Sequence, residues 1–69
     1  MRRKVVHSSN LVSIGYDVNS ETLEVEFRDS IYQYYNVPES AYIGLMSEGS
    51  KGRYLQKHIK DKFRNKKIK

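Results

Sequence analysis

Lysine and arginine side chains crowd the C-terminal part of this sequence, and their spacing suits contact with phosphate groups. Residues 51–69 hold nine Lys and Arg against one acid, Asp61, which gives this segment a net charge of +8. Cations three or four positions apart on a helix share a face, which can meet successive phosphates of a nucleic acid and release counterions. The candidate phosphate-binding cations are Lys51, Arg53, Lys57, Lys60, Arg64, Lys66 and Lys67, with Lys69 at the end of the same basic tail.

The net charge of the whole chain is +5, but its sign changes along the sequence. Residues 5–50 carry Arg28 against seven acids, a net charge of −6, and the first four residues add +3. A molecule polarised in this way attracts polyanions to one end and repels them elsewhere. We therefore predict a phosphate-binding surface at the C-terminal end. The alternative is a basic helix face that is only solvated.

The segment Ser50-Lys51-Gly52 is a second candidate for binding anions. Ser50 suits the N-cap of a helix, whose first N–H groups are free, and Gly52 would let a ligand backbone come close. Lys51 adds a cation beside these groups. The alternative is simple helix capping after Gly49, and the sequence leaves both open. The segment is not a P-loop, because the required Gly-x4-Gly-Lys-Ser/Thr pattern is absent.

The residues that could support catalysis or metal binding are few and scattered. Glu24 and Glu26 share a strand face, the minimum for acid–base chemistry, but alternating Glu on a solvated strand is ordinary. His7 and His58 are isolated, and the chain has no cysteine. A chain this short is also not expected to surround a pocket of several hundred Å3. We predict a protein that is not an enzyme, with no catalytic residues, metal, cofactor or small-molecule substrate.

Six tyrosines raise the possibility of stacking on nucleic-acid bases. Five of them fall on expected core faces of strands or helices, where the ring is buried and the hydroxyl reaches the rim. Tyr35 alone points to the open face of the sheet, so it is the single candidate for stacking or for a protein interface.

The elements that position these residues can be read from periodicity. Apolar residues alternate in 12–16, 23–28 and 31–36, which predicts three antiparallel strands joined by tight turns, the second turn at Asp29-Ser30. Pairing Ile14 with Val25, and Val25 with Tyr34, puts the apolar residues of all three strands on one face. The apolar face collects Val12, Ile14, Tyr16, Leu23, Val25, Phe27, Tyr32 and Tyr34, and the other, solvated face collects Ser13, Glu24, Glu26, Arg28, Gln33 and Tyr35.

Two helices are expected to follow the strands and cover the apolar face. Pro38 suits the first turn of a helix over 38–47, and Gly49 breaks it. A second helix over 51–64 has an apolar stripe that runs to Phe63. The predicted fold class is α+β, a three-stranded antiparallel meander packed against two C-terminal helices in two layers. We expect one domain over residues 1–69, with its core at about 6–64, while the ends, 1–8 and the basic tail 65–69, are candidates for disorder.

Five segments of the chain together resemble the KTSC domain. They are Ser8-Ser9-Asn10-Leu11, Ile14-Gly15-Tyr16, Tyr32-Gln33-Tyr34, Val37-Pro38 and Ser50-Lys51-Gly52, and the resemblance covers about residues 6–63. That family occurs as stand-alone small proteins and as a C-terminal appendage of some lysyl-tRNA synthetases. The resemblance therefore implies a module that handles RNA. One departure is Asp29-Ser30, where the family usually has a glycine before the third strand.

The sequence as a whole predicts a small, non-catalytic module that binds RNA, or less favourably DNA, through the basic face of its C-terminal helix. The alternative is a protein–protein adaptor or inhibitor that uses the open sheet face around Tyr35 or a free edge of the third strand. No segment approaches the length needed to cross a bilayer and no signal peptide is evident, so a cytoplasmic protein without membrane contact is expected.

Overall fold

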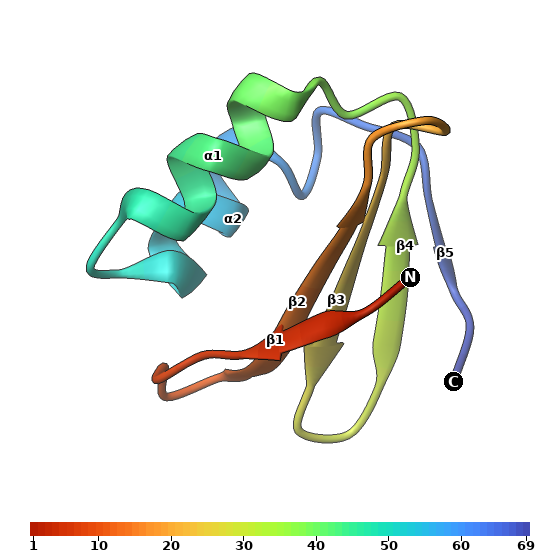
Figure 1. Ribbon diagram of the computed structural model, residues 1–69. Helices are drawn as coiled ribbons and strands as arrows, with labels where there is room; N and C mark the ends of the chain where they lie inside the picture. The colour runs from red at the N-terminus through yellow and green to blue at the C-terminus, as the bar shows by residue number, and fades with distance from the viewer.

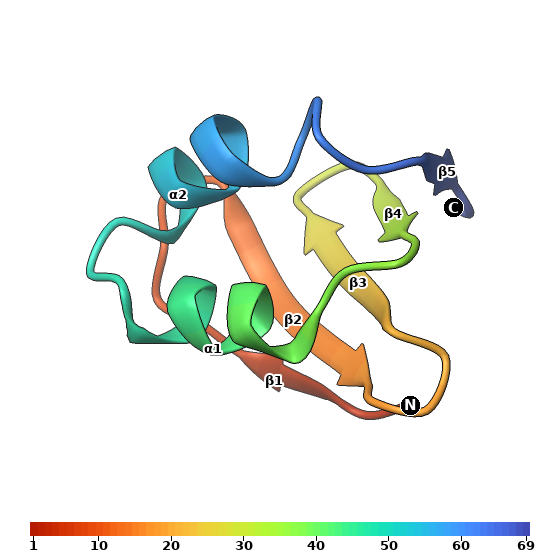
Figure 2. The same ribbon diagram turned by 90° about the horizontal axis from the view of Figure 1, so that it is seen from above.

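The chain folds into one antiparallel sheet with two helices packed against one of its faces (Figures 1 and 2). A computed structural model describes all residues from 1 to 69. It confirms the predicted α+β class and the two layers, but the sheet has five strands, in the order β1-β2-β3-β4-β5, where three were predicted. The elements are β1 (Arg3–Val5), β2 (Leu11–Asp17), β3 (Thr22–Phe27), β4 (Ile31–Tyr34), α1 (Glu39–Ser47), α2 (Lys51–His58) and β5 (Asn65–Lys67).

The two additional strands form the edges of the sheet. β1 pairs with β2, and β5 pairs with β4. Each has only three residues, all exposed, so neither carries the alternation of apolar and polar residues by which a strand is recognised in sequence. Both ends, considered above as candidates for disorder, therefore contribute to the sheet. Because β5 occupies the outer side of β4, the third strand of the meander has no free edge, and that part of the adaptor hypothesis was wrong.

The predicted register between β2 and β3 is confirmed for most of the pair. Ile14 lies opposite Val25 and Tyr16 opposite Leu23, but Leu11, not Val12, lies opposite Phe27. Val12 is the additional residue of a β-bulge, which shifts the register by one at this end of the strand. Leu11 consequently enters the core at 2% exposure, whereas Val12 is half-buried.

The predicted register between β3 and β4 was wrong by two residues. Val25 lies opposite Tyr32 and Leu23 opposite Tyr34. The turn lies one residue earlier than the expected Asp29-Ser30, because the Phe27 N–H donates to the Ser30 carbonyl at 2.7 Å and encloses Arg28 and Asp29, which moves each opposed position by two. A shift of two residues preserves the side-chain faces, so the apolar residues still point toward the helices.

The core lies between this face of the sheet and the two helices. Tyr34 is its largest side chain, at 3% exposure. At the edge of the core the rings of Tyr16 and Tyr42 stack at 4.9 Å and 9°, and the Tyr16 hydroxyl donates to the Val37 carbonyl. The buried apolar residues are Val6, Leu11, Ile14, Leu23, Val25, Tyr34, Val37, Leu45, Leu55 and Ile59.

Helix α1 begins close to where it was predicted, with Pro38 at its N-cap, but α2 ends six residues early, at His58 instead of Arg64. Ile59 is fully buried and leaves the helical conformation at φ −124°. The chain then turns toward the sheet, where the Tyr35 N–H donates to the Arg64 carbonyl at 2.8 Å. A helix continued to residue 64 could not deliver residues 65–67 to the edge of β4.

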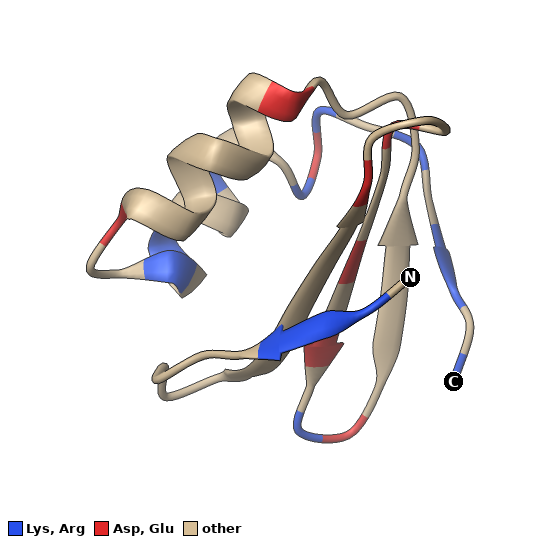
Figure 3. Cartoon of the chain, in the orientation of Figure 1, with Lys and Arg blue, Asp and Glu red and all other residues tan.

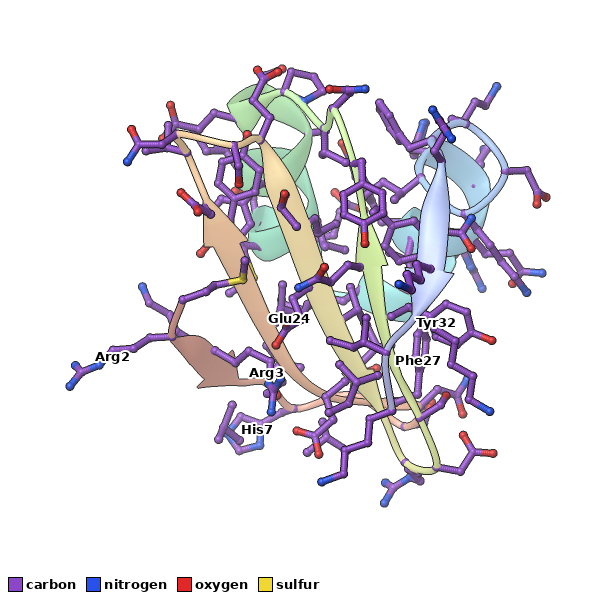
Figure 4. All side chains as sticks on the ribbon, turned by 90° about the vertical axis from the view of Figure 1, so that its right-hand side faces the viewer. Arg2, Arg3, His7, Glu24, Phe27 and Tyr32 are labelled. Atoms are coloured by element: carbon purple, nitrogen blue, oxygen red, sulfur yellow. The ribbon has the colours of Figure 1, made fainter.

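The outer face of the sheet, away from the helices, is covered at one end by Arg3 of β1. Its Nε donates to the Ser13 hydroxyl at 2.9 Å, and its guanidinium pairs with Glu24 (Figure 4). Ser13 and Gly15 are buried beneath it, so the expectation that this face is solvated was wrong at Ser13. A Cβ at Gly15 would lie 2.8 Å from the Arg2 carbonyl oxygen and 2.9 Å from the Arg3 Cγ.

Gly15→Ala should therefore displace β1. We expect the free energy of unfolding to fall by about 1–3 kcal/mol, the usual cost of overpacking. Urea denaturation measures this loss, and hydrogen exchange should show faster exchange at the amides of Lys4 and Val6, which face β2 in the ladder. Gly49→Ala is the matched control, because a Cβ at Gly49 meets nothing within 4 Å. Equal stability of the two variants would contradict the close packing of β1 on Gly15.

Candidate nucleic-acid interface

A cleft of about 870 Å3 lies between helix α2 and the side of β4 and β5 that faces the helices. Its walls come from Asn10 and Leu11, the β3–β4 loop, α2, the segment that follows α2, and β5. The chain lines this hollow without surrounding it, because the hollow is widely open to solvent. The space exists because α2 stops at His58 and the chain crosses to β5 without covering this end of the sheet (Figure 2).

Aromatic rings form the sheet side of the cleft. Phe27 and Tyr32 lie beside each other next to β5 (Figure 4), in an edge-to-face arrangement at 5.8 Å and 86°. The Tyr34 ring follows at 6.5 Å from Tyr32, with 27° between their planes. Tyr32 was predicted to lie on the core face, and it does, but it is only half-buried and lines the cleft. Sequence reasoning missed it as a site residue because a helix extending to residue 64 would have covered it.

The hydroxyls of Tyr32 and Tyr34 make no hydrogen bond within the protein, unlike those of Tyr16 and Tyr35, which donate to Val37 and Gln33. No buried side-chain oxygen or nitrogen lacks a partner, so the Tyr34 hydroxyl keeps contact with solvent although its residue is 3% exposed. The cleft, which Tyr34 lines, provides that contact. Burial, then the nearby Tyr32 and Asp61, raise the pKa of Tyr34, which is therefore a hydrogen-bond donor at neutral pH.

Cations stand on both sides of the cleft. Lys60 borders it just after α2, and Lys67 borders it from β5, where it lies opposite Tyr32. Arg53 and Lys57 are exposed on α2 and do not line the cleft themselves. Each is the next residue after one that does, Gly52 and Gln56 respectively, and so points about 100° away from it around the helix axis. Figure 3 shows Lys and Arg on α2, on the segment after it and on β5, whereas acids lie on β3 and near both ends of α1. The cleft also includes Arg28 and two acids, Asp29 and Asp61.

The remaining predicted site residues lie elsewhere. The Lys51 Nζ donates to the Glu48 carbonyl at 2.7 Å and so is engaged in the turn between the helices. Ser50 occupies the N-cap position, but its side chain makes no capping hydrogen bond. Gly52 borders the cleft, where a Cβ would lie 4.0 Å from the Ser8 Oγ.

Arg64 and Lys66 border a second hollow of about 330 Å3 together with Tyr35, beyond the end of β4. The predicted cations therefore do not share one helix face, because residues 59–64 are not helical. They form three groups: Arg53 and Lys57 on α2, Lys60 and Lys67 at the cleft, and Arg64 and Lys66 beside Tyr35.

The other candidate chemistry has a structural explanation. Glu24 accepts from the Gln33 amide at 2.8 Å and Glu26 from the Ser13 hydroxyl at 2.7 Å, so both carboxylates belong to the network around Arg3. The His58 ring packs on Tyr54 at 4.6 Å. No three His, Asp or Glu side chains gather as a metal-binding group, and neither helix is long and apolar enough to cross a membrane.

The architecture and the cleft define the class of molecule: a small α+β domain whose two helices cover only part of an antiparallel sheet. The chain belongs to the KTSC domain family, which matches residues 7–63, as the five segments predicted. A KTSC domain protein from Yersinia pestis of known crystal structure is 46% identical, with a TM-score of 0.95 over 99% of this chain and 97% of that one.

Two sequence relatives show the settings in which such a domain occurs. An uncharacterized protein of Stutzerimonas stutzeri is 38% identical over 87% of this chain and 86% of its own length. A lysine–tRNA ligase of Nostoc punctiforme is 37% identical over 81% of this chain, which corresponds to 10% of the ligase. Three of the five segments that carry the family resemblance contribute to the cleft, through Asn10 and Leu11, Tyr32 and Tyr34, and Gly52.

The raised pKa of Tyr34 predicts an alkaline loss of stability. Folding favours the protonated phenol, so this contribution is complete below pH 10.0, the ordinary pKa, and is lost as the pH rises from there toward the raised value. Phenylalanine has no such proton, so Tyr34→Phe should lose less unfolding free energy than the wild type between about pH 9 and about pH 11. Urea denaturation at both pH values measures this difference, and equal losses would contradict it.

Proposed function

We propose that this KTSC domain binds RNA, with phosphates held by cations on both sides of the cleft. The observation that carries the proposal is that Lys60 and Lys67, from two separate segments, border a hollow with aromatic residues on one side, while Arg53 and Lys57 are exposed on the adjoining helix α2. All four cations are exposed. Exposed Lys and Arg bind phosphate by releasing counterions, which makes the affinity dependent on salt.

The shape of the surface favours flexible, unpaired strands over a duplex groove. Helix α2 has eight residues, and Leu55 on its inner face is buried against the sheet. A recognition helix places several of its own side chains in the major groove, whereas the cations here are divided between α2, the segment after it and β5. Proteins that recognise RNA commonly bind single-stranded regions, where bases stack on aromatic side chains.

The relationship to a lysine–tRNA ligase gives a second reason to favour RNA. A segment of that ligase, 37% identical to this chain, lies within a protein whose name specifies tRNA as a substrate. The adaptor hypothesis has less support, because β5 covers the edge of β4, one of the two surfaces that it could use. The acids of the open face, Glu24 and Glu26, are engaged by Arg3, Gln33 and Ser13.

The test is a titration of the protein against fluorescently labelled single-stranded RNA, tRNA and duplex DNA at several salt concentrations. We expect single-stranded RNA and tRNA to bind more tightly than duplex DNA, with affinity falling log-linearly with salt. Lys57→Glu with Lys60→Glu should weaken binding at least about tenfold and reduce the salt slope by about 1.4, since two contacts to a single strand each contribute about 0.7.

A matched control is Arg2→Glu with Lys4→Glu, which changes the net charge equally. Both residues are exposed, at the end of the sheet farthest from β5. This control should retain most of the affinity, because the overall charge is the same in the two variants while only the first changes the cleft. Equal losses would show that attraction is general and not located at the cleft. Absence of RNA binding even at low salt would exclude the proposal.

A further inference from the structure

The two tyrosine hydroxyls in the cleft are polar groups to which the protein itself supplies no hydrogen-bond partner. Tyr34 is only 3% exposed, yet its hydroxyl makes no hydrogen bond with the protein and keeps solvent contact in the cleft. Burying a hydroxyl without a partner is unfavourable, so structures satisfy such groups with protein atoms or water, and a ligand that enters the cleft can take the place of that water. Tyr32 adds a second hydroxyl without a protein partner, on a ring whose centroid lies 6.5 Å from that of Tyr34.

The surroundings of these hydroxyls suit a flat molecule with hydrogen-bonding edges. The rings of Phe27 and Tyr32 offer aromatic surface. The Gln56 side chain lines the opposite wall and makes no hydrogen bond within the protein. The volume of about 870 Å3 falls within the range of roughly 300–1,000 Å3 typical of ligand sites. A planar group could therefore contact a ring and exchange hydrogen bonds with hydroxyls and an amide at once.

The charges around the cleft determine how such a ligand would be oriented. Lys60 and Lys67 are exposed cations at its borders, whereas Asp61 lies near the Tyr34 hydroxyl and raises its pKa. A bare anion is therefore disfavoured next to Tyr34 and favoured near the two lysines. A neutral, planar group in the cleft, joined to phosphates outside it, satisfies both conditions.

We infer that the cleft is a subsite for one unpaired RNA base, with Tyr32 and Tyr34 hydrogen-bonding to the edge of the base and Lys60 and Lys67 holding the adjoining phosphates. This inference rests on the proposed function, because it specifies which part of the RNA enters the site. A base in a duplex has its edge paired and both faces stacked, so it must be unpaired to enter. The subsite thus makes the domain selective for single strands.

Hydroxyl deletions test the inference with little risk to the fold. Tyr32→Phe with Tyr34→Phe keeps both rings and removes only two hydroxyls that have no partner in the protein. The expected loss of affinity for single-stranded RNA is about tenfold, from two hydrogen bonds, with the salt slope unchanged because no phosphate contact is lost. Tyr42→Phe is the control, since its ring stacks on Tyr16 outside the cleft, and it should bind like the wild type.

A second measurement distinguishes binding of the base from binding of the phosphate, and does so without the rest of the RNA. Nuclear magnetic resonance titrations with adenosine and uridine 5′-monophosphates should shift the side-chain amide signals of Gln56 and Asn65, which line the cleft. Ribose 5-phosphate, which lacks the base, should leave these signals much less changed. The shifts should be weaker in the variant with Tyr32→Phe and Tyr34→Phe.

The outcomes distinguish this inference from the proposed function. Salt-dependent RNA binding that is unaffected by the two phenylalanine substitutions, with equal affinity for single strands and duplex RNA, would overturn the base subsite and leave the phosphate-binding proposal intact. Loss of RNA binding in the Lys57 and Lys60 variant, with nucleotide shifts retained, would support both. If the nucleotides cause no more shift than ribose 5-phosphate, the base subsite is wrong whatever the RNA result.

Discussion

The backbone of β4 requires a partner on its outer side, and the way the chain provides one determines much of the rest of the structure. An uncovered strand edge exposes a row of unpaired N–H and C=O groups. Residues 64–69 supply the missing bonds: Tyr35 donates to Arg64 at 2.8 Å, and Ile31 exchanges bonds with Ile68 and Lys69. To reach that edge the chain must leave α2 at Ile59, and the early end of the helix leaves the cleft beside Tyr32 uncovered.

The opposite edge is protected in a different way. β1 supplies a short, charged edge strand, and Arg3 folds over Gly15 to reach Ser13 and Glu24. Charged residues on short edge strands are a common means of preventing association between sheets. The outer face is thereby held by a polar network of the protein itself, whereas the tyrosine hydroxyls that have no protein partner and reach solvent in the cleft lie on the helix side. The two faces of the sheet differ in what they leave available to a ligand.

The sequence was informative where a periodic pattern is long enough to be unambiguous. The alternation around Ile14 and Val25 predicted the correct faces, and the error of two residues between β3 and β4 did not alter them because side chains alternate with a period of two. The bulge at Val12 and the loop over 27–30 depend on backbone hydrogen bonds that side-chain patterns do not encode. β1 and β5 are exposed and only three residues long, so they leave no pattern to detect.

The end of α2 shows why the site was harder to predict than the fold. The apolar stripe of the predicted helix ran to Phe63, and Phe63 does pack against the core, but from a non-helical segment. Burial was thus inferred correctly while the conformation was not. That single difference moved Lys60 and Arg64 off the helix face and exposed Tyr32. The cations were identifiable from composition; their grouping around a cleft was not.

The arrangement of these cations alters the kind of recognition that the proposed function implies. Lysines in a row on one helix face would contact phosphates along a line and carry no information about the bases. Lys60 and Lys67 instead belong to separate segments on either side of a hollow whose acids, Asp29 and Asp61, disfavour phosphate within it. Phosphates held on the two sides would then direct the connecting nucleotide inward, toward Tyr32. On this arrangement, the charge pattern contributes to the orientation of the RNA as well as to its affinity, because like charges repel the backbone from the place where a base fits.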